Sequence, residues 1–322
     1  MDHFELEIND RLAEILKKAV PERGKLTNLL CEQLEIEKVA IYRRLRNDIP
    51  FTFAEVVKIA KWLGISLDSI VGESNPYRSQ AFQLYWQDFF NLNEKDEKMS
   101  NDYIAAIILA AHNPYSEFGI AVNGLPLHVT VQFPTIFRFY VLKWMYQFGK
   151  PGELIKYSDV VLPEFLLDIH RRYRAAVLQV GYTYFISDET AFQKLINDIH
   201  YFKSIHLITD DEIAQLKDDF TEMFSRIEAI AIKGAYPNGN EVEIYTSGVS
   251  FETTYTYLYS ESVYVSMIGV FTTGSMSSVD PQSCNHMRSW LRALKRTATP
   301  ITGNEKNRIQ YIEKQLKVLN TL

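Results

Sequence analysis

The most constraining feature of the sequence is a short run in which two helical patterns of apolar residues are separated by only three residues. The second pattern follows so closely that the two helices must pack against each other across a tight turn. A small residue, Cys31, lies where the helices would approach most closely. The apolar positions that would hold them together are Leu30, Leu34, Ile36, Ile41 and Leu45. This packing leaves the opposite face of the second helix, residues 37–47, free.

The free face of residues 37–47 is basic and partly aromatic. Arginine can bind guanine through two hydrogen bonds, and lysine or tyrosine can reach a phosphate or a base edge. Valine can contact a thymine methyl group, and the major groove of DNA admits one α-helix. The residues that recur on this face are Lys38, Val39, Tyr42, Arg43 and Arg46. They are therefore predicted to contact double-stranded DNA.

Two neighbouring residues are predicted to contribute less. Thr27 is a candidate phosphate contact at the start of the first helix. Arg44 lies about 100° around the helix from Arg43, so it should reach either a phosphate or an acidic neighbour. The alternative interpretation is that the basic run is an ordinary solvated helix face, as most charge runs are.

The first part of the chain is predicted to be all-α. Thr52 and Glu55 form a capping-box pattern, which opens a helix that should end at Gly64. Ser66 would cap a last turn through Ile70. The earlier helices are expected at Glu5–Ala19, Leu26–Gln33 and Glu37–Asn47.

Residues 26–71 resemble the XRE/Cro-type helix-turn-helix family, which phage repressors typify. The resemblance is most specific from Ile59 to Asp68, where the sequence reads Ile-Ala-Lys-Trp-Leu-Gly-Ile-Ser-Leu-Asp. It implies that residues 37–47 form the recognition helix and that the five residues of the free face contact bases. Two positions depart from the pattern, because Glu35 replaces the usual turn glycine and Glu37 replaces a Ser or Thr. Together with Glu32, these carboxylates indicate an alternative in which a degenerate module binds protein.

Turn-forming residues mark a domain boundary. Gly72-Glu73-Ser74-Asn75-Pro76 disfavours helix, so the sequence predicts a helix-turn-helix domain at 1–71, a linker at 72–78 and a larger domain at 79–322. The net charge of −6 excludes a protein that is basic throughout, and any DNA contact must come from a local patch.

The larger domain is predicted to be helix-rich α+β with a small antiparallel sheet near 241–271. Its pattern changes from helical to alternating after residue 240. The expected strands are Glu241–Tyr245, Thr253–Tyr259 and Val263–Phe271. The expected helices lie near 79–92, 101–112, 134–148, 163–180, 190–203, 281–296 and 304–320, with another behind the capping box Thr209–Glu212.

No catalytic motif, phosphate-binding loop or metal-ligand spacing is recognised, so we expect no enzyme activity, cofactor or metal. His170, Arg171 and Arg174 concentrate positive charge and are a candidate ligand or anion site, with a solvated helix face as the alternative. Three tyrosines of one strand, Tyr255, Tyr257 and Tyr259, alternate onto one face. They form either ordinary cross-strand packing or a tyrosine-lined pocket.

Together these features predict a cytoplasmic, DNA-binding transcriptional regulator. A homodimer is expected because one helix-turn-helix reads few base pairs. The larger domain is expected to supply dimerisation and to be the part that would sense a small-molecule effector. No membrane association is expected, since the longest apolar stretch, Ile104–Ala111, is far shorter than the roughly 20 residues of a spanning helix. The alternatives are a protein-interaction module and an enzyme tethered to DNA.

Overall fold

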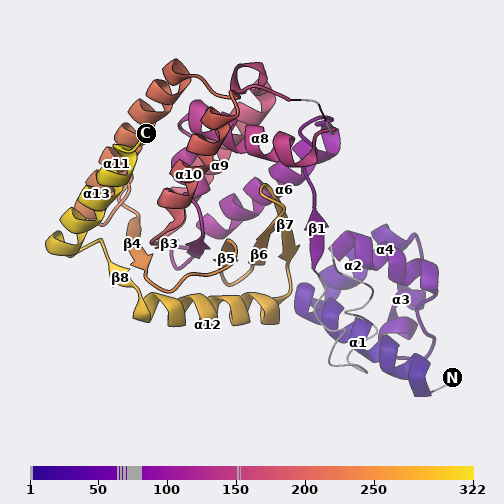
Figure 1. The fold of residues 1–322 in the computed structure, drawn as a ribbon. Coiled ribbons are helices and arrows are strands. Elements are labelled where there is room, and N and C mark those ends of the chain that lie inside the picture. Colours follow the sequence, from indigo (N-terminus) through magenta and orange to yellow (C-terminus); the bar gives the residue numbers. More distant parts are fainter. Residues whose placement is uncertain are drawn as a thin grey trace. The chain divides into compact units, whose positions relative to one another are not determined.

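The computed structural model describes residues 3–63, 65, 67, 70, 82–150, 152 and 154–322. The chain divides into two compact units, Met1–Ala81 and Phe82–Leu322 (Figure 1). The predicted linker at 72–78 lies outside the described residues, as do the predicted helix end at Gly64 and the predicted cap at Ser66.

The first unit is helical, as predicted. The elements of its described part are α1 (His3–Ala19), α2 (Arg23–Leu34), α3 (Lys38–Leu45) and α4 (Phe53–Leu63). Their apolar faces meet in one core, in which Leu12, Leu16, Leu30, Ile41 and Ile59 are completely buried. The packing of α2 against α3 across a tight turn, which the spacing of apolar residues predicted, is therefore present.

The turn between α2 and α3 depends on Glu35. This residue has a left-handed conformation, with φ 58° and ψ 39°, and its N–H donates to the carbonyl oxygen of Cys31 at 2.9 Å. The left-handed region is the one that glycine adopts without cost, which explains why glycine is usual there. The turn closes with glutamate instead.

Asn9 ties α1 to the chain that follows α3. Its side chain is buried, donates to the carbonyl oxygen of Arg44 at 2.9 Å and accepts from the N–H of Phe51 at 2.9 Å. It also hydrogen-bonds Asn47, which has a φ of 64° directly after the helix end. The first of these bonds satisfies a carbonyl group in the last turn of α3, and the second fixes the start of the segment that leads to α4.

The second unit contains a sheet of eight strands, and the predicted small antiparallel sheet is wrong. The strand order is β1-β7-β6-β5-β2-β3-β4-β8. Strands β2, β3 and β4 are parallel to one another, whereas the remaining pairs are antiparallel. The strands are β1 (Gln83–Tyr85), β2 (Glu117–Val122), β3 (Tyr182–Asp188), β4 (Glu241–Ser247), β5 (Tyr255–Tyr259), β6 (Tyr264–Val270), β7 (Gly274–Ser278) and β8 (Thr299–Pro300).

The missed central strands explain the error. Every residue of β2 is buried, and so are six of the seven of β3, so neither strand shows an alternation of polar and apolar residues. Such strands are not distinguished from buried helix by periodicity alone. The predicted strand at 241–245 therefore pairs with β3 and β8 and not with β5.

Most predicted helices of the second unit are confirmed within a few residues. The capping box of Thr209 and Glu212 is present at the start of α11. The predicted helix at 79–92 is wrong, because its described part contains strand β1 and loop. The helices are α6 (Glu94–Ala111), α7 (Leu127–Thr130), α8 (Pro134–Phe148), η1 (Tyr157–Asp159), α9 (Glu164–Val177), α10 (Ala191–Ser204), α11 (Asp210–Lys233), α12 (Pro281–Thr297) and α13 (Glu305–Leu319).

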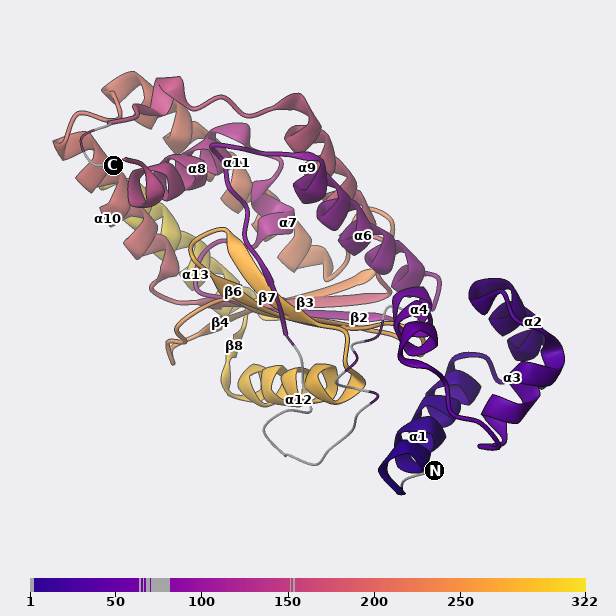
Figure 2. The ribbon, with the colours of Figure 1, turned by 90° about the vertical axis from the view of Figure 1, so that its right-hand side faces the viewer.

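The helices are distributed very unequally over the two faces of the sheet. One face packs on α6, α7 and the helices beyond them and forms the large core, to which β2 contributes Phe118 and Ile120. The opposite face is covered by α12, which lies across β5, β6, β2 and β4 (Figure 2). A separate, smaller core lies beneath α12, centred on Cys284 and Leu291.

Among the described residues, no helix is long and apolar enough to cross a membrane.

Candidate functional site

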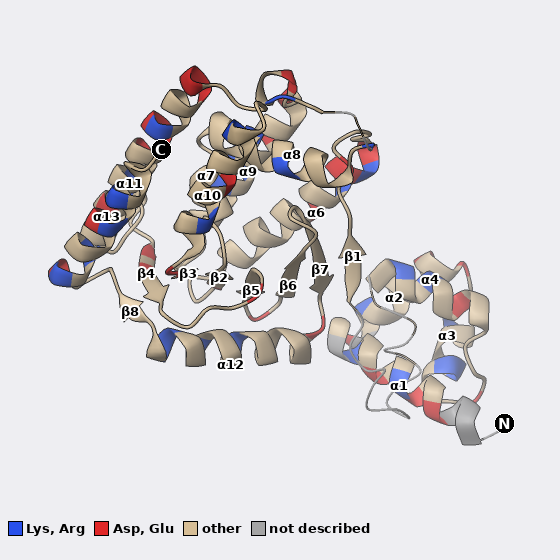
Figure 3. Ribbon diagram, in the orientation of Figure 1, with Lys and Arg blue, Asp and Glu red and all other residues tan. Residues whose placement is uncertain are grey.

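The outer face of α3 presents the five residues that are predicted to contact DNA. Lys38, Val39, Tyr42, Arg43 and Arg46 are all exposed, and Val39 and Tyr42 have exposed fractions of 67% and 40%. Figure 3 shows where the basic residues lie on the helix. An exposed valine and tyrosine beside basic side chains give this face apolar as well as cationic contacts.

The inner face of α3 fixes this orientation. Ile41 is completely buried, and Leu45 packs against the same core one turn later. Residues 42, 43 and 46 then point outward because they lie on the opposite side of the helix. Within the described part of the chain, the side chains of Arg43 and Arg46 form no ion pair. Their guanidinium groups are therefore available to an anionic partner.

Arg44 and Thr27 lie elsewhere. The guanidinium of Arg44 binds both carboxylate oxygens of Glu55 at 2.8 Å, and the two side chains are only 14% and 12% exposed. Thr27 is 1% exposed. Arg44 therefore binds an acidic neighbour, which was one of the two partners expected from the sequence. Neither Arg44 nor Thr27 lies on the outward face of α3 that is predicted to contact DNA.

The Arg44–Glu55 pair also joins α3 to α4. Glu55 accepts from the N–H of Thr52 at 2.8 Å and returns its own N–H to the Thr52 hydroxyl at 3.3 Å, so the predicted capping box is present. Burial alone would raise the pKa of Glu55, but the hydrogen bonds from Arg44 and Thr52 hold this pKa below its usual value. Glu55 therefore stays ionised and keeps Arg44 turned inward.

The predicted anion site on α9 is not assembled as one cluster. His170 is buried with its ring centroid 4.2 Å from that of Phe137, and burial lowers its pKa to about 4. Arg171 has a side chain that is 63% exposed and pairs with Glu164 and Asp168. Arg174 is half-buried, and burial together with the nearby Arg226 lowers its pKa. His170 is neutral at neutral pH, and Arg171 lies 100° away from it around the helix.

A second polar site, which the sequence did not reveal, lies between α12 and the sheet. Seven tyrosines of β3, β4, β5 and β6 share this face: Tyr182, Tyr184, Tyr245, Tyr255, Tyr257, Tyr259 and Tyr264. The predicted alternation of the tyrosines of β5 onto one face is part of it. Glu117 of β2 lies among them, directly opposite Tyr182 on one side and Tyr259 on the other.

Glu117 is the centre of the hydrogen bonds at this second site. Its carboxylate is 4% exposed and binds the guanidinium groups of Arg288 and Arg292, at 2.6 and 2.7 Å. The hydroxyl of Tyr257 donates to the same carboxylate and also contacts the hydroxyl of Tyr184 at 3.0 Å. Burial favours the neutral acid, but the hydrogen bonds from Tyr257, Arg292 and Arg288 hold the pKa of Glu117 below its usual value.

Gly119 makes room for this arrangement. It faces α12 between Tyr257 and Tyr184 in the register of the sheet. A Cβ atom at Gly119 would lie 2.3 Å from Cε1 of Tyr257 and 2.9 Å from Cζ of Tyr184. The two rings therefore meet above a residue that has no side chain.

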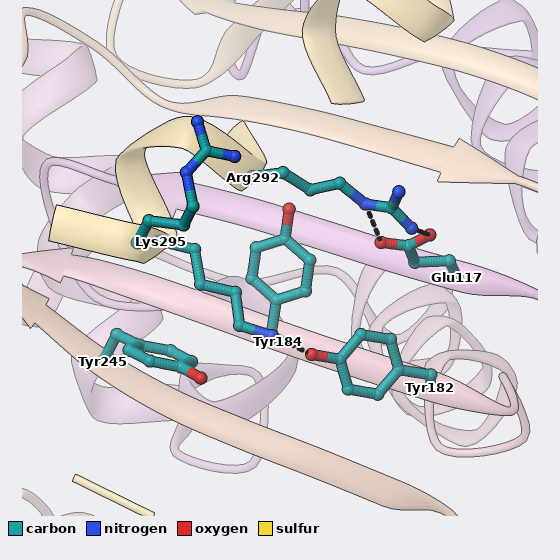
Figure 4. Close-up of a pocket in the computed structure, with 7 residues that line it drawn as sticks. Glu117, Tyr182, Tyr184, Tyr245, Arg292 and Lys295 are labelled. Atoms are coloured by element: carbon teal, nitrogen blue, oxygen red, sulfur yellow. Dashed lines mark hydrogen bonds and ion pairs between the residues drawn. The ribbon is translucent and has the colours of Figure 1, made fainter. Parts of the chain in front are cut away.

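Lys295 forms the other half of the second site. Its ammonium group binds Glu243 and the hydroxyl of Tyr182. It also lies 5.0 Å from the ring centroids of Tyr182 and Tyr184 and 5.3 Å from that of Tyr245. Beside it is a cavity of about 490 Å³, shown in Figure 4 and lined by Glu117, Tyr182, Tyr184, Tyr245, Arg292, Lys295 and Arg296.

Comparison with known proteins bears on the first unit. Residues 3–83 match the family model of the BetR domain, a helix-turn-helix type of DNA-binding domain associated with transcription regulation. The match covers the four helices described above. It supports the helix-turn-helix prediction and a DNA-binding regulatory role at this level, without assigning the chain to the XRE/Cro type. No curated protein and no solved structure matches the chain.

Proposed function

We propose that the protein is a sequence-specific transcriptional regulator that inserts α3 into the major groove of double-stranded DNA. The observation that carries the proposal is the outward face of α3, where Arg43 and Arg46 are exposed and form no ion pair within the described residues. The match of residues 3–83 to a DNA-binding domain supports it. Arg43 and Arg46 would bind bases, and Lys38 and Tyr42 would bind phosphates or base edges.

In the same proposal, the protein binds as a homodimer and acts by binding rather than by catalysis. One recognition helix reads only a few base pairs, and a two-fold partner doubles the site. The second unit would hold the partner copy and receive an effector molecule. In support of an effector site, this unit contains a cavity lined by charged and aromatic side chains.

The proposal is tested on a DNA site selected from genomic fragments with the full chain. Binding of that duplex is measured by fluorescence anisotropy over a series of salt concentrations. In the Arg43→Ala, Arg46→Ala double variant we expect at least about tenfold weaker binding, because each bidentate base contact is worth about 1–3 kcal/mol. The slope of log affinity against log salt concentration should change little, because it reports the phosphates that are neutralised, whereas Arg43 and Arg46 are assigned to bases.

The matched control is the Arg171→Ala, Arg172→Ala double variant. It removes the same charge from two exposed arginines of α9, so binding should equal that of the wild type. Equal losses in both double variants would mean that net charge alone drives binding, and the recognition-helix proposal would then fail.

A second candidate function is protein binding by the same module. Glu32, Glu35 and Glu37 are exposed beside the basic face, and a carboxylate close to a phosphate opposes DNA binding. If fragment selection returns no DNA site although circular dichroism shows a folded helical protein, this second function replaces the first.

A further inference from the structure

We propose that the cavity between α12 and the sheet binds a small organic anion, whose phosphate or carboxylate group is held by Arg292 and Arg296. The binding claim does not depend on DNA recognition; only its regulatory consequence rests on the proposed function. The site is assembled from residues far apart in the sequence, since α12 supplies its cations and strands β2, β3 and β4 supply its floor.

The charge of the cavity favours an anion. Its lining contains three cations but only one carboxylate, that of Glu117. Two further residues bind the lining residues: Arg288 adds one positive charge and Glu243 adds one negative charge. Glu241, exposed at the start of β4, lowers the positive excess without removing it. A concave surface with a positive excess raises the local concentration of small anions.

Hydrogen-bond donors at the cavity remain unused. Arg292 donates from Nε and Nη2 to Glu117, and its third nitrogen, Nη1, has no acceptor among the described residues (Figure 4). Arg296 is exposed and forms no ion pair with any described residue. Guanidinium nitrogens in this state match the oxygens of a phosphate or a carboxylate.

The partners of Arg292 and Lys295 hold these two cations in place before a ligand arrives. The buried carboxylate of Glu117 fixes the plane of the Arg292 guanidinium through two bonds, at 3.2 and 2.7 Å. Glu243 and Tyr182 fix Lys295 in the same way. Because these side chains are already ordered, binding an anion costs little further conformational entropy.

The tyrosines define the rest of the ligand. Burial raises the pKa of Tyr182, Tyr184 and Tyr245, so their hydroxyl groups stay protonated at neutral pH. Their rings offer apolar area beside the cations, and a volume of about 490 Å³ lies within the range of small-molecule sites. The expected ligand therefore carries a small, ring-sized body next to its anionic group.

A ligand in this cavity touches both α12 and the sheet. The polar contacts of α12 to the sheet include the pairs of Arg288 and Arg292 with Glu117 and of Lys295 with Glu243. An anion that draws Arg292 or Lys295 toward itself shifts the position of α12. If the protein regulates transcription as proposed above, this shift is the means by which the effector would act.

The test is isothermal titration calorimetry, in which inorganic phosphate, phenyl phosphate or benzoate is added to the full chain without DNA. Benzyl alcohol is the neutral probe. We expect saturable binding of phenyl phosphate or benzoate, weaker binding of inorganic phosphate and none of benzyl alcohol. Stronger binding of phenyl phosphate identifies a phosphate ligand, whereas stronger binding of benzoate identifies a carboxylate.

The decisive variant is Arg296→Gln, because Arg296 takes no part in the bonds that hold α12 to the sheet. We expect it to weaken binding by about tenfold or more, the usual effect of losing a hydrogen bond to a charged group. Lys306→Gln removes one exposed charge from α13 and should leave binding unchanged. The Arg43→Ala, Arg46→Ala variant should also bind the anions normally, which separates this proposal from the DNA proposal.

Two outcomes overturn the proposal. One is equal affinity of wild type and Arg296→Gln for the anion that binds best. The other is the absence of binding by all three anions at millimolar concentration, although circular dichroism shows that the protein is folded.

Discussion

Both units of the protein present a basic helix, but the two helices treat their cations in opposite ways. In the first unit, Arg43 of α3 and Arg46, which directly follows this helix, are exposed and form no ion pair with any described residue. On α12, Arg288, Arg292 and Lys295 face inward and are bound to carboxylates. The same residue types thus form an open cationic surface in one unit and a fixed, partly neutralised cluster in the other.

The difference indicates two kinds of anionic partner. An exposed row of unpaired cations suits an extended polyanion, because each phosphate can displace water and counterions along the whole face. A concave cluster held by the carboxylates of Glu117 and Glu243 suits a small anion, because its donors are few and already oriented. The first unit also contains a cation that is fixed by a carboxylate, because Arg44 of α3 binds Glu55 of α4.

The largest expected effect comes from breaking the fixed cluster at its centre. Glu117→Gln removes the charge that two arginines share in a buried site, and we expect a loss of about 3 kcal/mol in the free energy of unfolding. Urea unfolding followed by circular dichroism measures it. Glu261→Gln, at an exposed position, is the control. A loss below 1 kcal/mol would mean that these pairs are no stronger than surface ion pairs.

A smaller effect is expected from filling the space above Gly119. Gly119→Ala places a methyl group within 2.3 Å of the Tyr257 ring, so the ring must move, and overpacking of this kind costs about 1–3 kcal/mol. Thermal unfolding measures the loss. Gly24→Ala is the matched control of opposite sign, because nothing lies within 4 Å of that helical position and alanine should stabilise α2. Equal stability of wild type and Gly119→Ala would show that the tyrosine rings are not fixed.

The smallest effect concerns the fixed pair of the first unit. Glu55→Gln should cost about 1 kcal/mol at neutral pH, a moderate value because solvent screens part of the pair. The pKa of Glu55 is lowered in the folded protein, so its contribution is complete above about pH 4.5 and is lost as the pH falls through the lowered value.

The difference in stability between wild type and Glu55→Gln should therefore shrink on acidification. Chemical unfolding at neutral pH and at a pH well below 4.5 measures it, with Glu14→Gln, exposed on α1, as the control. A difference that stays constant over this range would contradict the role assigned to the ionised carboxylate.

The sequence predicted the first unit well because its elements are amphipathic. Each helix alternates buried and exposed positions with a period near 3.6, and the capping box of Thr52 and Glu55 marks a helix start directly. The ends were less exact, since α3 stops at Leu45, where the prediction extended to Asn47. Asn47 has a positive φ, which the asparagine side chain tolerates and which ends the helix.

The sequence predicted the second site poorly because its residues meet only through the sheet. Glu117 looks like a surface residue next to a turn, and its burial follows from the parallel pairing of β2 with β3, 65 residues later in the register. The spacing of Arg288, Arg292 and Lys295 places them on one face of a helix, but the local sequence does not show which carboxylates they bind. The tyrosine alternation of β5 was the one feature of this site that periodicity could reveal.

The order of strands has a further consequence for how the chain is made. Strand β1 pairs with β7, and β2 pairs with β5, so both of these early strands find an antiparallel neighbour only after more than 130 further residues. During synthesis the first unit can fold as soon as it has emerged, whereas the sheet can be completed only when nearly the whole remaining chain has been made. A chain that ends before β5 would therefore have a folded helical unit and an unpaired, aggregation-prone edge on β2.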